Sequence, residues 1–384
     1  MWNKRKANGL LFLEVLLAFI VLFAVYTFAS FSFEQSRSPL GFEYENGLQV
    51  EFAWEEGLDS LDVLALQQRV QREVNAIEGV EAVAFIGTVG PFTRNTWQTV
   101  NSDNGFDLTF KMFFGDEYLP DAAGLNVVEG RWFNESDESA RYNSIVINRA
   151  FKEAYFPGVN TLIDSVIYTS GQTKIVGMVE DFKYYSNFAE RVPLAFFSQR
   201  GTDFGYEPFR SLWVRTTPGR KVDVQEAIYE AVLAVTKNSS ITIKDLSLAR
   251  KAANRPTIIP LVIVSLIAGF LLINTALGLF GVLFTQINRR RAEIGLRKAL
   301  GATPGGVMSQ FVVEVLLVAA AALLLGTLFA VQLPLLDLVP LESRFLYYGI
   351  GGAVLTILLV VTLCALLPSL QAARLHPAHV LHED

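Results

Sequence analysis

Four long apolar runs divide the chain, and only the first of them precedes its large polar region. The runs cover residues 9–31, 258–284, 311–333 and 346–367. A helix needs about 20 predominantly apolar residues to cross a bilayer core about 30 Å thick. The pattern therefore predicts an integral membrane α-helical protein with four transmembrane helices.

The first run follows a short basic segment, residues 1–8, and two interpretations compete for it. A cleaved signal peptide also begins with basic residues, but its apolar core is only about 7–15 residues and ends at small side chains. Here the run is longer and ends near Tyr26, Phe28 and Phe31. These features favour an uncleaved anchor whose N-terminus lies inside.

The polar region, residues 32–257, contains no run of membrane length and alternates helical and strand patterns. Apolar side chains at helical spacing predict helices over residues 58–77 and 221–235. Strand patterns occupy residues 80–88, 106–113, 144–147, 174–179, 211–216 and 241–246. We therefore predict a large extracytoplasmic α+β domain inserted between transmembrane helices 1 and 2. Its size allows one core or two small lobes.

Charge supports this division. Residues 34–255 hold 22 basic and 31 acidic side chains, whereas the rest of the chain is net positive. Starting from an inside N-terminus, residues 285–310 and the tail, residues 368–384, fall in the cytoplasm, and 334–345 form a short outer loop. An acidic insert excludes nucleic acid as a partner. We expect a multi-pass protein of the bacterial inner membrane with both termini cytoplasmic.

The cytoplasmic segment has ordered charges. On a helix, Glu293 would lie on one face with Arg289 or Arg290 before it and with Arg297 after it, each pair contributing about 0.2–0.5 kcal/mol. Gly301 is placed to end that helix in a left-handed cap. Thr303 then predicts an N-cap, with a proline at the next position. The segment is therefore predicted to be a helix, a tight turn and a second helix.

Motifs for chemistry are missing from the sequence. It contains no G-x-x-x-x-G-K-[ST], G-x-S-x-G or H-E-x-x-H. The acid pairs Asp116–Glu117 and Glu180–Asp181 are interpreted as exposed carboxylates. The only cysteine is Cys364, so no disulfide forms within the chain. We predict that the chain is not an enzyme and itself binds no cofactor.

Three histidines, His376, His379 and His382, gather in the tail at a spacing of three. On one helix they would share a face and could bind a metal, but Pro377 interrupts such a helix. No metal site is therefore assigned.

Two acids, Glu14 and Glu314, fall within predicted membrane helices. An ionisable group at this depth is expensive and often functional, yet near a helix end it can reach the interface or a basic neighbour. For Glu314, directly after the basic segment, we expect an ion pair with arginine or lysine. Small residues in the helices allow close packing: Ser265, Gly269, Gly278, Gly281, Gly326, Gly349, Gly351 and Gly352.

Several segments together resemble MacB/FtsX-type ABC transporter permeases. RRRAEIGLRKALGATPGGVMSQFVVEVLL, from residue 289, matches the family pattern R-x-x-E-I-G-[IL]-R-[KR]-A-[LI]-G-A followed by a Gln and a Glu. The tail PSLQAARLHPAHVL resembles the family ending. EGRWF, SIVINRAF and KIVGMVEDFKYYS, which begin at residues 129, 144 and 174, resemble the MacB-like periplasmic core domain.

The resemblance implies a permease that works by mechanotransmission, moving its outer domain rather than passing substrate through the membrane core. Its partners would be a cytoplasmic ABC ATPase dimer, which binds ATP and Mg, a second identical or homologous permease, membrane lipid and, in some members, a periplasmic adaptor and an outer-membrane channel. The residues implied to contact the ATPase are Arg290, Glu293, Ile294, Gly295, Arg297, Lys298 and Gly301.

Three functions remain open from the sequence. The first is efflux or extrusion of peptides, lipids or antibiotics. The second is an FtsX-like regulatory role that activates envelope hydrolases or signals. The third is a membrane-anchored sensor without an ATPase, which the basic segment between the helices argues against.

Overall fold

The structure is a computed structural model of the 384-residue chain. The chain forms two compact units. It describes residues 2–55, 57–93, 97–101, 108–134, 136–137, 142–168, 172–198, 209–336, 338–339 and 341–373. The helical unit contains residues up to Glu34 and from Pro256 onward, and the inserted unit is Gln35–Arg255.

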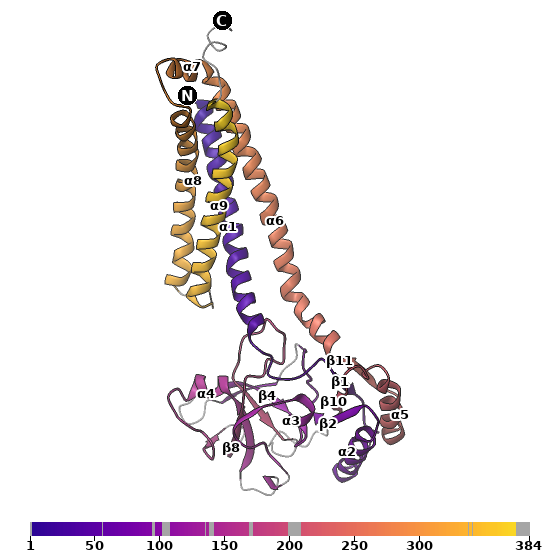
Figure 1. Cartoon of the computed structure of the whole chain (residues 1–384). Helices are drawn as coiled ribbons and strands as arrows, with labels where there is room; N and C mark the ends of the chain where they lie inside the picture. Colours follow the sequence, from indigo (N-terminus) through magenta and orange to yellow (C-terminus); the bar gives the residue numbers. More distant parts are fainter. Residues whose placement is uncertain are drawn as a thin grey trace. The chain divides into compact units, whose positions relative to one another are not determined.

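The inserted unit contains two β-sheets (Figure 1). The first has the strand order β11-β1-β10-β2, and its strand pairs are all antiparallel. Its strands are β1 (Gly47–Glu51), β2 (Val80–Ile86), β10 (Ser211–Thr216) and β11 (Thr242–Asp245). Leu212 and Val214 of β10 pack against helices α2 (Ser60–Asn75) and α5 (Val224–Thr236), whereas Trp213 between them faces the opposite core. This alternation follows from the two-residue period of a strand.

The second sheet mixes parallel and antiparallel pairs in the order β3-β4-β9-β6-β8-β5, with β7 paired to β8. Its strands are β3 (Trp97–Asn101), β4 (Leu108–Phe114), β5 (Val127–Gly130), β6 (Asn143–Asn148), β7 (Val166–Tyr168), β8 (Gln172–Val179) and β9 (Leu194–Phe197). Helix α4 (Arg149–Tyr155) packs Phe151 against one face, and the short α3 (Leu119–Ala123) lies in the core of the other. That second core also holds Trp213, so the two sheets share it.

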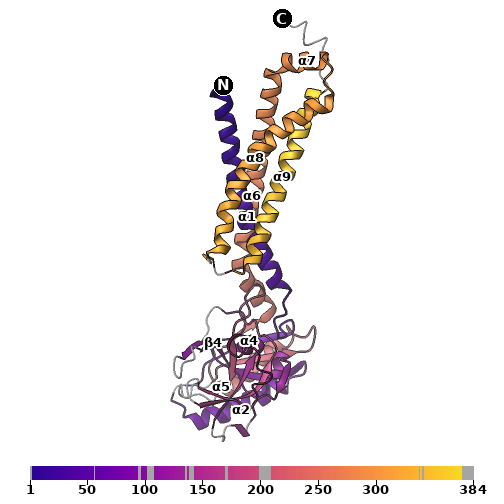
Figure 2. The same cartoon turned by 90° about the vertical axis from the view of Figure 1, so that its left-hand side faces the viewer.

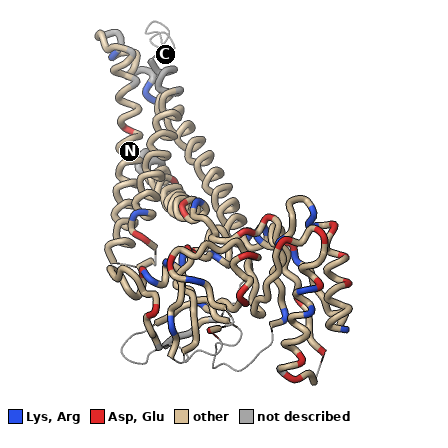
Figure 3. Tube along the Cα trace, turned by 60° about the horizontal axis from the view of Figure 1, so that its bottom comes forward, with Lys and Arg blue, Asp and Glu red and all other residues tan. Residues whose placement is uncertain are grey.

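The predicted α+β insert is confirmed, and it has two lobes joined by a shared core. The helices predicted at 58–77 and 221–235 are present as α2 and α5. The sequence patterns missed the short strands β1, β3, β5, β7 and β9. Figure 3 shows that charged residues are spread over this unit and are sparse along the long helices.

The helical unit contains four helices long and apolar enough to cross a membrane among the described residues. They are α1 (Trp2–Arg37), α6 (Leu246–Arg289), α8 (Pro304–Leu335) and α9 (Ser343–Ala373). At 44 residues, α6 is much longer than its predicted apolar run, because its first turns belong to the insert. The last apolar run was predicted to end at residue 367, directly before Pro368, and this end was wrong, since α9 continues through Pro368 to Ala373. A proline removes one backbone hydrogen bond, which membrane helices tolerate.

Aromatic side chains of α1 fit against glycines of α8 and α9. A Cβ at Gly326 would lie 2.5 Å from the Phe19 ring, and one at Gly352 would lie 2.8 Å from the Tyr26 ring. The Tyr26 hydroxyl also makes a 2.8 Å hydrogen bond with the Thr356 hydroxyl. Glycine therefore lets α1 approach α8 and α9 closely, as expected for membrane helices.

Candidate functional site

The segment between α6 and α8 is a compact turn that contains the short helix α7 (Arg291–Ala299). Figure 2 shows α7 at the same end of the helical unit as the start of α1. Gly301 follows with a φ of +96°, a left-handed conformation that suits glycine. The Thr303 hydroxyl then accepts a 3.2 Å hydrogen bond from the Gly306 amide at the start of α8. The predicted helix, turn and capped second helix are confirmed.

Arg290 sits where α6 ends and α7 begins, and this break changes its partner. Its amide donates to the carbonyl of Gln286 at 3.2 Å, and its guanidinium donates to both carboxylate oxygens of Glu314, at 3.1 and 3.4 Å. The predicted pairing of Arg289 or Arg290 with Glu293 was wrong, because it assumed one continuous helix. The expected ion pair of Glu314 with a basic residue is confirmed.

Arg297 makes the second link between α7 and α8. It donates to Glu293 at 2.5 Å on its own helix, as predicted, and to the Gln310 side chain of α8 at 2.8 Å. Two arginines therefore fix α7 against the first turns of α8. A helix of only nine residues would not be stable alone, so these contacts give it a defined position.

Burial separates the segment into an inner and an outer side. Ile294 is only 4% exposed and packs in the helical unit's own core, and Gly295 is buried as well. In contrast, Leu296 is 56% and Leu300 80% exposed, four residues apart at the end of the segment. The side chain of Lys298 lies outside the described residues. Among the described residues of the predicted contact set, Glu293, Arg297 and Gly301 are exposed, and Leu296 and Leu300 are exposed beside them, whereas Ile294 and Gly295 are buried.

Leu296 and Leu300 were absent from the set of contact residues implied by the family resemblance. The signal for them was present in the sequence, since two leucines four residues apart interrupt an otherwise charged segment. Two exposed leucines on one helical face are the kind of apolar contact that a protein partner buries.

Glu14, the other acid in a membrane helix, has a different environment from Glu314. Its Oε2 is buried and makes no hydrogen bond within the described chain. It lies against α6, where a Cβ at Gly278 would be 2.6 Å from this oxygen. Among the described residues, this oxygen therefore has no basic neighbour within hydrogen-bond distance, unlike the carboxylate of Glu314.

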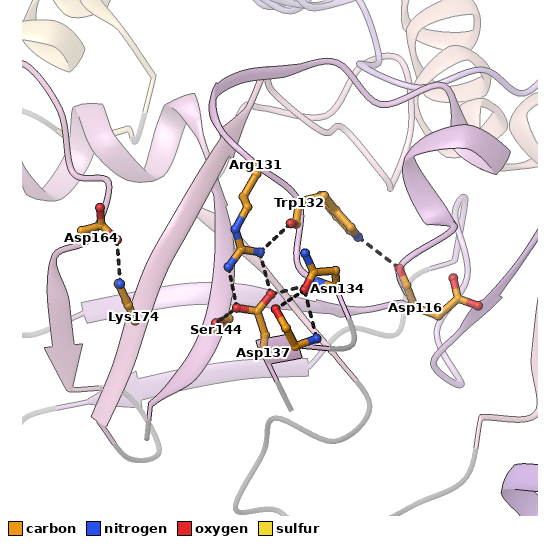
Figure 4. Close-up of polar contacts among 9 residues, drawn as sticks. Asp116, Arg131, Trp132, Asn134, Asp137, Ser144, Asp164 and Lys174 are labelled. Atoms are coloured by element: carbon orange, nitrogen blue, oxygen red, sulfur yellow. Dashed lines mark hydrogen bonds and ion pairs between the residues drawn. The ribbon is translucent and has the colours of Figure 1, made fainter. Parts of the chain in front are cut away.

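The insert holds a polar cluster around Arg131 (Figure 4). Its guanidinium donates to both oxygens of Asp137, at 2.6 and 2.7 Å, and that carboxylate also accepts from the Asn134 amide and the Ser144 hydroxyl, both at 2.9 Å. The Arg131 hydrogen bonds lower the pKa of Asp137 to about 2. With its oxygens occupied in this way, Asp137 serves to hold the chain between β5 and β6.

One acid of each pair considered for chemistry is structural too, whereas Glu180 is exposed as predicted. Burial raises the pKa of Asp116 to about 8, and its carboxylate accepts from the Phe85 and Tyr118 amides at 2.7 and 3.0 Å. Its side chain is therefore only partly exposed, unlike the predicted exposed acid. Asp181 accepts from the Ala150 amide at 3.0 Å and pairs with Arg191 at 3.2 Å. Both carboxylates are therefore occupied in holding the backbone of the insert.

No group of three or more His, Cys, Asp or Glu side chains in the described part of the chain is arranged to hold a metal. The three tail histidines lie outside the described residues.

Four membrane-length helices with an α+β domain inserted after the first, and a charged turn after the second, define a class of membrane permease. Family models match both parts. The MacB-like periplasmic core domain matches residues 15–231, and the FtsX-like permease C-terminal domain matches residues 265–377. The chain belongs to the family of FtsX-like ABC transporter permeases with a MacB-like periplasmic core domain.

Related proteins of low sequence identity are also ABC transporter permeases. The chain is similar to the macrolide export ATP-binding/permease protein MacB of Bordetella avium, at 24% identity over 70% of this chain and 42% of that protein. It is also similar to the uncharacterized ABC transporter permease YknZ of Bacillus subtilis, at 23% identity over 81% of this chain and 79% of that one. The chain therefore spans about two fifths of the MacB relative.

A solved structure also matches the chain. It is the periplasmic region of MacB from Actinobacillus actinomycetemcomitans, at 13% identity and a TM-score of 0.38, over 54% of this chain and 92% of that one.

Proposed function

We propose that this chain is the permease subunit of an ABC transporter, driven by a cytoplasmic ABC ATPase dimer that docks on α7. The observation that carries the proposal is the pair of exposed leucines, Leu296 and Leu300, on a segment fixed by Arg290 and Arg297. A docking surface must be rigid to transmit force, and both arginine contacts supply that rigidity. ATP and Mg would bind to the partner, since this sequence contains no P-loop motif.

The proposed mode of action is mechanotransmission. α6 is one helix from Leu246 to Arg289 and contributes residues to both units, so a displacement at α7 would pass along it toward the insert. Polar side chains in its middle satisfy themselves locally, as Thr275 does by donating to the Leu271 carbonyl at 2.9 Å. The described membrane-length helices therefore offer few polar groups to a substrate. This supports motion of the outer domain rather than passage of a hydrophilic substrate between the helices.

The substrate class follows from the relatives only as a proposal. MacB proteins are named for macrolide export. We infer extrusion of peptides, lipids or antibiotics at the outer face of a bacterial inner membrane, with both termini in the cytoplasm. Two permeases, identical or homologous, would provide the second half of the assembly. A periplasmic adaptor and an outer-membrane channel would join in an envelope that has two membranes.

The docking surface is tested with Leu296→Asp and Leu300→Asp in the full chain, purified with its ATPase and reconstituted in lipid nanodiscs. Each introduces a charge where apolar contact is proposed, so we expect at least a tenfold loss of permease-stimulated ATP hydrolysis, the equivalent of about 1.4 kcal/mol of lost contact. Val222→Asp is the matched control, because Val222 is an exposed apolar residue of the insert. Unchanged stimulation by both leucine variants would remove α7 from the ATPase contact.

Cells that lack the gene distinguish efflux from a regulatory role at the outer face of the membrane. Efflux predicts increased susceptibility to drugs or antimicrobial peptides with normal cell separation. Chained cells with unchanged susceptibility would instead support a regulatory role in envelope hydrolysis.

A further inference from the structure

The loop that leaves β8 touches both of the helices that connect the insert to the membrane. We call residues 181–187 the tie loop; it contains the DFKYYS part of a motif that the site around α7 leaves unexplained. The last turn of α1 and the first turns of α6 belong to the inserted unit, as the tie loop does. All the contacts that follow therefore lie within one compact unit.

Lys183 binds the C-terminal end of α1. It is only 2% exposed, and its ammonium donates to the carbonyl of Gln35 at 2.7 Å and to that of Asn187 at 2.7 Å. The last carbonyls of a helix lack partners in the helix and attract positive charge. Lys183 supplies both a donor and a charge at this end.

The chain directly after α1 packs on the same loop. The Lys183 amide donates to the Leu40 carbonyl at 2.8 Å. Gly41, with a φ of +84°, lies so close that a Cβ there would be 1.7 Å from the Asp181 carbonyl oxygen. Only glycine allows this approach, so the chain leaving α1 and the tie loop are in direct backbone contact.

Asn187 binds α6 on the other side of the loop. Its amide donates to the Asn254 side-chain oxygen at 3.1 Å, and the Asn254 side-chain nitrogen donates back to the Asn187 side-chain oxygen at 3.0 Å. Asn254 is 9% exposed. Lys183 also binds the Asn187 carbonyl, so a short chain of hydrogen bonds runs from α1 through the loop to α6.

The tie loop is anchored in the core that the two sheets share. Phe182 is 2% exposed and packs on Phe42, Phe113 and Phe196 at ring distances of 4.8, 5.0 and 5.1 Å. The Tyr184 carbonyl accepts from the amide of Phe92, whose φ of +63° is uncommon for a bulky residue. Such strained conformations persist only where the surrounding packing holds them.

We propose that the tie loop is the element that passes helix movement into the insert, with Lys183 and Asn254 as the positioning residues. The inference rests on the proposed function, because it needs an ATP-driven movement of α1 and α6. Two helices joined through one buried loop must shift the loop when they shift relative to each other. Phe182 then carries that shift into the core between the sheets.

The test uses the full chain with its ATPase in lipid nanodiscs, and measures hydrogen–deuterium exchange of β8 and β9 with and without trapped ATP. Lys183→Met removes the bond to α1, and Asn254→Ala removes the bond to α6. Lys152→Met is the matched control, because the ammonium of Lys152 also makes two hydrogen bonds, to the Asn160 carbonyl at 2.7 Å and to the Glu129 carboxylate at 3.0 Å, but from α4. We expect the ATP-dependent change in the wild type and in Lys152→Met, and its loss in the other two while ATP hydrolysis continues.

A purely structural role would lower stability without removing the nucleotide-dependent difference, so a wild-type response in both tie variants overturns the inference. A wild type without any ATP-dependent change overturns the proposed function itself. A further variant guards against misfolding: Asn187→Cys with Asn254→Cys and Cys364→Ser, joined by a short, reducible bifunctional thiol reagent. Cross-linking should restore the response and reduction should remove it; no response in the cross-linked protein contradicts the tie.

Discussion

Helix α6 and helix α1 are embedded very differently in the helical unit. In the most apolar part of α6 only 6% of residues are buried, against 28% for α1, 33% for α8 and 28% for α9. Side chains of α1 pack directly against glycines of α8 and α9. In contrast, nothing in the described chain lies within 4 Å of the Cβ positions of Gly269 and Gly281 on α6. One side of the unit is therefore closely packed within the chain, and the α6 side is free to move or to meet lipid or another chain.

The close packing of α1 is the feature whose loss should cost most. A Cβ at Gly349 of α9 would lie 2.0 Å from the Thr27 hydroxyl and 2.9 Å from the Phe23 carbonyl oxygen. Gly349→Leu therefore forces α1 away, and we expect a loss of about 3 kcal/mol, the upper part of the range for overpacked positions. Thermal unfolding of the full chain in detergent measures it.

Gly351 supplies the control for that experiment. It lies two residues further along the same helix, and nothing in the described chain is within 4 Å of its Cβ position. Gly351→Leu should shift the melting temperature little. Equal destabilisation by both variants would mean that close contact with α1 is not the cause of the effect.

The Arg290–Glu314 pair should come next. The two side chains are about one quarter and one third exposed, so the pair is only partly screened by solvent. Arg290→Met leaves the Glu314 carboxylate in an apolar helix, and we expect a loss of about 1.5–3 kcal/mol.

A double-mutant cycle with Glu314→Gln measures the coupling of this pair directly. The double variant should recover part of the loss, because the charge of the Glu314 carboxylate is then removed together with that of Arg290. Additive losses in unfolding experiments would show that the two residues act independently.

The sequence predicted the features that depend on local pattern. Apolar length indicated the four helices, and Gly301 and Thr303 indicated the turn before α8, since caps need only neighbouring residues. The pairing of Arg290 could not be read in this way, because Glu314 is 24 residues distant and meets it only after the chain reverses. The outward side of α7 depends on the same reversal, so the burial of Ile294 and the exposure of Leu296 could not be read from their spacing.

The contacts of the tie loop were even less accessible to prediction from local sequence pattern. Its motif was visible, but Lys183 meets Gln35 across 148 positions and Asn187 meets Asn254 across 67. Long-range hydrogen bonds of this kind have no periodicity for a pattern to detect. The five missed strands are short, at three to five residues, and so carry too little alternation to be distinguished from loops.

The smallest expected effect has the opposite sign and concerns Glu14, which lies where α1 meets α6. Its Oε2 is buried without a partner among the described residues, so Glu14→Met removes an unsatisfied polar atom and keeps nearly the same volume. We expect a gain of about 1 kcal/mol in the stability of the isolated chain, whereas Glu314→Met should lower stability because it leaves Arg290 unpaired. Melting temperatures of the two variants in the same detergent compare them. If Glu14→Met also lowers stability, the carboxylate must gain a partner that a single chain does not provide. The open α6 side would then be the place where that partner binds.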